Sequence, residues 1–162
     1  MLRQKRRNQG TPGSHGGNMD NLMITTGSIL YLPIFVRGAL FGLDDLHAAM
    51  GDGEIGVSGV EVAGSVKLRS KVVKNLKISD PILSNDNHFT TIASGKTVDD
   101  AIVKATENMA FILRDRIPLS LHEIAMIMSA TGQAQICQVV NPLKTARFVM
   151  PSWVLDAYNF QL

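Results

Sequence analysis

The sequence predicts a mixed α+β fold that is mainly β, with sandwich- or barrel-like strands and a two-helix portion at about residues 97–131. Two observations predict it. Twelve of the 14 glycines lie between Gly10 and Gly64, where short apolar runs alternate with turn residues. Residues 97–131 instead carry apolar side chains at helical spacing. A chain of 162 residues that is 45% hydrophobic can bury the core of one domain.

Residues 1–10 are predicted to form a disordered basic tail, followed by one domain over residues 11–162. The tail carries four of the 16 basic residues, so the rest of the chain has 12 basic and 14 acidic residues, a net charge of −2. The domain also lacks the interleaved aromatic and basic residues that single-stranded nucleic acids require. We therefore expect no nucleic-acid partner.

Short strands are expected on both sides of the helical portion. Before it, the apolar runs predict strands at residues 28–36, 55–61, 63–68, 71–78 and 89–93, with a loop at 79–88. After it, strands are expected at 133–140 and 145–150, joined by a turn at Asn141–Pro142. The apolar side chains of the C-terminus are expected to pack back onto the domain: Trp153, Val154, Leu155 and Tyr158.

Two helices are predicted from their end signals. Thr97 is a suitable N-cap for the first, and Pro118 prevents its continuation. Ser120 and Glu123 have the spacing of a capping box, which predicts the start of the second helix. Gly132 is expected to end it.

The chain has a single cysteine, Cys137, which excludes an internal disulfide framework. Its place in an apolar strand favours a buried small side chain. The sequence has no long apolar run of the kind that crosses a membrane or follows a basic signal-peptide end. We therefore expect a cytoplasmic protein with no membrane partner.

The first candidate for chemistry is the segment from Asp45 to Glu54. His47 and the nearby carboxylates are residue types that bind divalent metals and move protons. Asp52 and Glu54 are two apart and would point the same way in an extended segment. Gly51 and Gly53 leave the backbone bare beside them, where N–H groups could face a developing oxyanion. Aspartate beside glycine is also an ordinary turn pattern, and this alternative stays open.

The second candidate is the segment Gly13–Asp20, in which His15 precedes two glycines and Asn18. His15 could be a metal ligand or could orient a substrate, and a loop of Asx turns is the alternative. His88 and His122 are expected at the surface. The chain has no Gly-x-Ser-x-Gly nucleophile motif, Walker A loop or Cys-x-x-Cys pair.

Five stretches, in order along the chain, resemble the acetamidase/formamidase family: residues 11–20, 30–41, 47–54, 91–94 and 129–141. The resemblance implies a mainly β fold with an α+β portion toward the C-terminus. It implies hydrolysis of formamide or acetamide to ammonium and a short carboxylate. It also implies a bound divalent metal, with zinc expected and calcium as the alternative; a homo-oligomer is expected.

The resemblance suggests roles for particular residues. His15, Asp45 and His47 are the candidate metal ligands, and Glu54 is the candidate general base. Asp52 could serve in either role. Asn18, Gly51 and Gly53 are the candidate substrate-binding residues.

In the family, the signature containing His15 lies near the middle of the protein, so the chain resembles the C-terminal part of the fold. Asp44 also stands where relatives carry glycine. The alternative expectation is therefore an inactive or incomplete fragment that needs a partner carrying the N-terminal half. Such a fragment would leave strand edges and apolar surface exposed.

Overall fold

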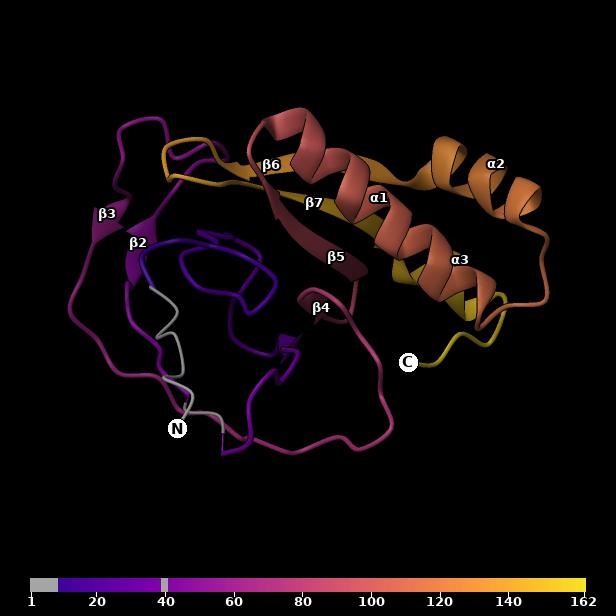
Figure 1. Ribbon diagram of the computed structural model, residues 1–162, viewed down its shortest axis with the longest axis horizontal. Coiled ribbons are helices and arrows are strands. Elements are labelled where there is room, and N and C mark those ends of the chain that lie inside the picture. Colours follow the sequence, from indigo (N-terminus) through magenta and orange to yellow (C-terminus); the bar gives the residue numbers. More distant parts are fainter. Residues whose placement is uncertain (1–8, 39–40) are drawn as a thin grey trace, which may run out of the picture.

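The architecture is a five-stranded antiparallel sheet covered by helices, seen in a computed structural model that describes residues 9–38 and 41–162 (Figure 1). Residues 1–8 of the expected tail lie outside the described residues. The sheet order is β1 (Ile29–Tyr31), β4 (Ile82–Ser84), β5 (His88–Gly95), β7 (Lys144–Pro151) and β6 (Gln133–Gln138). A separate two-stranded sheet pairs β2 (His47–Ala49) with β3 (Val60–Glu61). The α+β prediction is confirmed, but the described strands do not close into a barrel.

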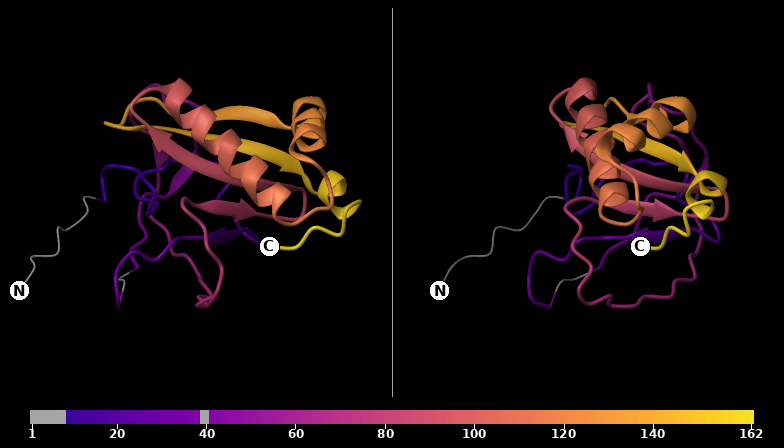
Figure 2. Two further views of the ribbon diagram at one scale, coloured as in Figure 1. Left: turned by 45° about the vertical axis from the view of Figure 1, so that its right-hand side comes forward. Right: turned by 90° about the vertical axis from the view of Figure 1, so that its right-hand side faces the viewer.

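The described residues form three helices, α1 (Val98–Arg114), α2 (Leu121–Thr131) and α3 (Ser152–Asp156). α1 and α2 lie on one side of the sheet, and irregular segments from the first 80 residues lie on the other (Figure 2). Two buried clusters match these layers. The larger joins α1 to alternate residues of β5 and β7. It includes Phe89 and Ala93 of β5, Ala105, Met109 and Leu113 of α1, and Phe148 and Met150 of β7. The smaller packs Met19 against Leu83 and Ile92.

The helix ends follow the sequence prediction. Thr97 caps α1, and Ser120 with Glu123 forms the expected capping box of α2. Gly132 ends α2 as predicted, but with extended backbone (φ −80°) instead of the left-handed conformation that favours glycine. Glycine is required there for a different reason: a Cβ atom would lie 2.5 Å from Cζ of Phe148.

Several strand predictions are wrong. Of residues 28–36 only β1 forms, residues 55–68 keep only β3, and residues 71–78 form no strand. The expected loop at 79–88 contains β4. An apolar alternation forms a strand only where a neighbouring strand offers backbone partners, and residues 63–78 pair with no strand among the described residues. At the C-terminus Val154 and Leu155 are buried as predicted, but Trp153 is 69% exposed.

Candidate functional site

Three of the predicted site residues, Asp45, His47 and Glu54, come together in the structure. Glu54 lies close enough to His47 and Asp45 to interact electrostatically with both, and it shares a hydrogen bond with Asp20. His47 lies in β2 with Asp45 just before it, whereas Asp20 and Glu54 lie in irregular segments, and Gly53 beside Glu54 bridges to Gln138 at the end of β6. We call Asp20 and Glu54 the acid pair.

His47 is surrounded by two carboxylates. Its Nε2 atom lies 3.0 Å from Oε1 of Glu61 and 3.5 Å from Oδ1 of Asp45. Cross-strand pairing of β2 with β3 places His47 directly opposite Glu61. Gly59 makes room for the imidazole, since a Cβ atom there would lie 2.6 Å from Cγ of His47. We call Asp45, His47 and Glu61 the His–acid triad.

The His–acid triad has the donor set of a divalent metal site. One ligand atom from each residue lies within 4.8 Å of the others. The buried Nε2 atom of His47 makes no hydrogen bond of good geometry in spite of its acidic neighbours. An imidazole nitrogen with carboxylate oxygens is a common zinc donor set. The residues present therefore fit a divalent cation.

The acidic environment changes the protonation of the cluster. Burial raises the pKa of Glu54 to about 7, and the charge and hydrogen bond of Asp20 add to this effect. Burial, followed by the hydrogen bond and charge of Glu61, also raises the pKa of Asp45. The pKa of Glu61 is lowered, first of all by the hydroxyl of Ser58, which donates to Oε1 over 2.8 Å. Glu54 can thus exchange a proton near neutral pH.

The backbone of Gly53 connects the Glu54 segment to β6. Its N–H donates to the carbonyl of Cys137 over 2.9 Å, and its carbonyl accepts from the N–H of Val139 over 3.1 Å. Gly53 adopts φ +98°, which favours glycine. The main chain at Gly53 is therefore occupied by structural hydrogen bonds, whereas the space beside the α-carbon of Gly51 is open.

Three acidic residues of the site have left-handed backbone. Asp20 and Glu54 both adopt φ +45°, and Asp45 adopts φ +71°. Such conformations are uncommon outside glycine, and they cluster at functional sites where the surroundings enforce them. The backbone conformation therefore supports a functional role for the site, independently of the argument from its charges.

Asp52 points to a different partner. Its Oδ2 atom accepts a hydrogen bond of 2.6 Å from Nη2 of Arg147, a β7 residue that is 2% exposed. The side chain of Asp52 is 38% exposed. Asp52 therefore neutralises a buried guanidinium and is not part of the His–acid triad.

His15 and Asn18 lie on the Gly-rich turn. His15 lines a hollow of about 520 Å³ together with Ser94 and Leu143, apart from the His–acid triad. Asn18 contributes its backbone, whose carbonyl accepts from Nδ2 of Asn141 over 3.2 Å. The structure thus joins Asp45, His47 and Glu54, whereas His15 lines the hollow beside Ser94 and Leu143.

Sequence reasoning missed several residues of the site. Glu61 joins His47 only through β-pairing, and no local pattern signals a contact across 14 positions. Asp20 falls within the Gly-rich segment but had no assigned role. Its Oδ2 atom accepts a 2.7 Å hydrogen bond from Nδ2 of Asn141 in the β6–β7 turn.

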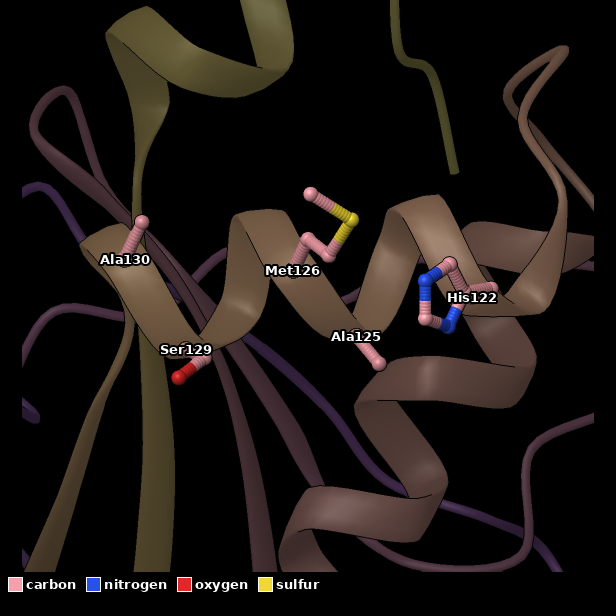
Figure 3. A pocket seen from close by; sticks show the side chains of 5 residues that line it. All are labelled: His122, Ala125, Met126, Ser129 and Ala130. Carbon is pink, nitrogen blue, oxygen red and sulfur yellow. The ribbon is translucent and has the colours of Figure 1, made fainter.

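A second hollow, of about 460 Å³, lies on the outer side of α2 (Figure 3). It is lined by residues of this one helix, namely His122, Ala125, Met126, Ser129 and Ala130. His122 is exposed, as expected, and no acid of the site lies there. None of the described helices has the length and apolar character needed to span a membrane.

Comparison with curated proteins gives relatives named for amide hydrolysis. The chain is 44% identical over 62 residues to a putative formamidase of Schizosaccharomyces pombe, a match covering 38% of this chain and 15% of that protein. It is 38% identical over 65 residues to a formamidase of Methylophilus methylotrophus, covering 40% of this chain and 16% of that protein. These matches therefore span about a sixth of the relatives' length.

Solved structures match nearly the whole chain. A predicted acetamidase/formamidase from Thermoanaerobacter tengcongensis superposes with a TM-score of 0.92 at 51% identity, covering 96% of this chain and 52% of that one. An acetamidase from Bacillus halodurans gives 0.90 at 50% identity, with coverages of 93% and 51%. The chain thus spans about half the length of these relatives. The model of the Acetamidase/Formamidase family matches residues 4–136. The chain therefore belongs to the acetamidase/formamidase family.

Proposed function

We propose that this chain carries the reacting groups for hydrolysis of short linear amides, such as formamide and acetamide, to ammonium and a carboxylate. One observation carries the proposal: a buried carboxyl with a pKa of about 7, Glu54, lies beside a His–acid triad suited to a divalent cation. Family membership and the names of the relatives support the same reaction class.

Asp45, His47 and Glu61 are the proposed metal-binding residues, with zinc expected and calcium as the alternative. The imidazole nitrogen favours zinc, because calcium prefers oxygen ligands only. A cation held there supplies polarisation of the amide carbonyl and a lower pKa for attacking water. His15, which lines a separate hollow, is proposed as a substrate-orienting residue instead.

Glu54 is the proposed general base. In its ionised form it takes a proton from the attacking water and then passes that proton to the leaving nitrogen, which departs as ammonia. A pKa near 7 suits a group that must both accept and return a proton at neutral pH. The hydrogen bond to Asp20 holds the carboxyl of Glu54 in place between the two transfers.

The proposed substrate position lies beside Gly51, where the space around the α-carbon is open. Gly53 and Asn18 are proposed to contribute through the backbone, since both form hydrogen bonds with their main-chain atoms.

The test is ammonia release from formamide by the zinc-loaded protein. Chelation should abolish activity and zinc should restore it. Glu54→Gln should lower kcat by about 100-fold or more, as expected for the loss of a general base. Glu107→Gln, on the exposed face of α1, is the matched control. Full activity in Glu54→Gln would disprove the assignment of the base.

An alternative function is favoured by exposed apolar side chains in residues 55–73, among them Ile55, Val57, Val60 and Val72. In this alternative the chain is an incomplete or inactive part of the family fold that works only with a partner carrying the other part. It predicts no ammonia release by the chain alone and a gain when the two polypeptides are mixed. Activity of the chain in monomeric form would exclude it.

We also propose a cytoplasmic location and a homo-oligomeric state. The free Cys137 is consistent with a reducing, cytoplasmic environment. The exposed apolar residues are consistent with a homo-oligomer. Light scattering coupled to gel filtration measures the second directly.

A further inference from the structure

Arg147 is a buried cation at the centre of four contacts. Besides the 2.6 Å bond to Asp52, its Nη1 atom donates to Oδ1 of Asn21 over 2.9 Å and its Nε atom to Oε1 of Gln135 over 2.7 Å. Nη1 also lies 3.8 Å from Sγ of Cys137. All three guanidinium nitrogens therefore have partners on three different segments.

The two loop contacts of Arg147 lie next to the acid pair. Asn21 directly follows Asp20, and Asp52 precedes Glu54 by two residues. The guanidinium thus joins both turns that carry these carboxyls to β7. Because a guanidinium is planar and has fixed donor directions, bonds to two turns also fix their relative orientation.

Both turns need such support. Asp20 and Glu54 have left-handed backbone, a conformation that persists only where the surroundings enforce it. A buried ion pair is by itself weak evidence for a contribution to stability, because desolvation of the charges offsets their attraction. Because Arg147 bonds to both strained turns, its contacts indicate a role in fixing the positions of these turns.

We propose that Arg147 is a positioning residue that holds the Asp20 and Glu54 turns against each other and so brings the acid pair into contact. The inference rests on the proposed amide hydrolysis, in which Glu54 transfers the proton. Arg147 touches neither carboxyl of the pair in the contacts described and acts through Asn21 and Asp52.

The first test is Arg147→Lys, which keeps the charge but loses the planar fork. We expect kcat for formamide to fall by about 100-fold, because a small displacement of a reacting group has an effect of this size. KM and zinc content should stay within about twofold of wild type. Arg114→Lys, in an exposed pair with Asp115, is the matched control and should behave as wild type. A kcat for Arg147→Lys within about twofold of wild type overturns the inference.

Two variants of Asp52 separate positioning from direct catalysis, and they also serve if Arg147→Lys does not fold. Asp52→Asn keeps an oxygen facing Nη2 and should retain at least about a third of kcat, whereas Asp52→Ala should lose about 10-fold or more. An asparagine cannot act as a base. Equal losses in the two variants would show that the oxygen kept by asparagine does not hold the Glu54 turn, and would overturn the inference.

A readout independent of activity distinguishes this inference from the proposed function. In chelator-treated protein, Arg147→Lys should shift the backbone NMR signals of residues 18–21 and 50–54, with those of α1 unchanged. If the wild type releases no ammonia, the proposed hydrolysis fails, and these signals still decide whether Arg147 holds the two turns. Unchanged signals in both turns would overturn the positioning role.

Discussion

At the scale of single residues, Glu54 links stability to pH. Its folded-state pKa of about 7 exceeds the ordinary value of 4.5, so the protein binds an extra proton on folding between these values. The associated stability is fully present below pH 4.5 and is lost as the pH rises through 7. Glu54→Gln removes the cost of a buried charge. In chelator, it should therefore be more stable than wild type by about 1 kcal/mol at pH 5 and about 3 kcal/mol at pH 8.

Denaturant unfolding at several pH values measures this difference. Glu107→Gln, on the exposed face of α1, is the matched control. A stability difference between Glu54→Gln and wild type that stays constant from pH 5 to 8 would contradict the prediction.

Asn141 offers a second residue-scale prediction. Its Nδ2 donates both to Oδ2 of Asp20, over 2.7 Å, and to the carbonyl of Asn18, over 3.2 Å. Asn141→Ala should lower the free energy of unfolding by about 1–3 kcal/mol, because a carboxylate loses a donor. Asn141→Asp should lower it further, since it adds a like charge beside Asp20. Chemical denaturation at pH 8 tests the order, and an Asp variant as stable as wild type would contradict it.

The sequence could predict those site residues that share one short segment. Asp45, His47 and Glu54 fall within ten residues rich in glycine, and the structure brings them close together. Glu61 and Arg147 could not be predicted, because their roles depend on strand pairing and on a contact across 95 positions. The spacing of Asp52 predicted that it would act beside Glu54, but its carboxylate instead binds the buried guanidinium of Arg147.

At the scale of elements, Gly132 shows how packing restricts a helix end. Its extended backbone would admit any residue, but a Cβ atom would meet the Phe148 ring at 2.5 Å. Gly132→Ala should therefore cost about 1–3 kcal/mol by overpacking. Gly56→Ala is the control, since its nearest neighbour would be 3.9 Å from the new methyl group. Thermal unfolding of both variants measures the difference, and equal melting temperatures would contradict it.

Helices were predicted more accurately than strands for a physical reason. The capping boxes of α1 and α2 lie within four consecutive residues, so local sequence contains the whole signal. A strand depends on a partner that may come from anywhere in the chain. Residues 82–84 form β4 because β1 and β5 flank them, whereas the equally β-prone residues 71–78 pair with nothing among the described residues.

At the scale of the whole molecule, apolar side chains are distributed unevenly. The core between sheet and helices is well buried, but residues 55–73 expose a row of apolar side chains, namely six valines with Ile55 and Leu68. Val66, Leu68 and Val72 are 46%, 55% and 70% exposed and belong to neither buried cluster. Exposed apolar surface of this kind promotes association. The row is therefore the surface through which the chain is expected to self-associate or bind a partner.

This surface gives the last prediction. A triple variant with serine at Val66, Leu68 and Val72 should lower the apparent mass in light scattering at high protein concentration. Its melting temperature should change little, because the three side chains contribute nothing to the core. Val154→Ser, at a residue only 5% exposed, should instead lower the melting temperature, because buried apolar contacts are lost. If the triple variant associates as strongly as wild type, the contact surface must lie elsewhere, and the exposed face of α2 around Met126 becomes the next region to alter.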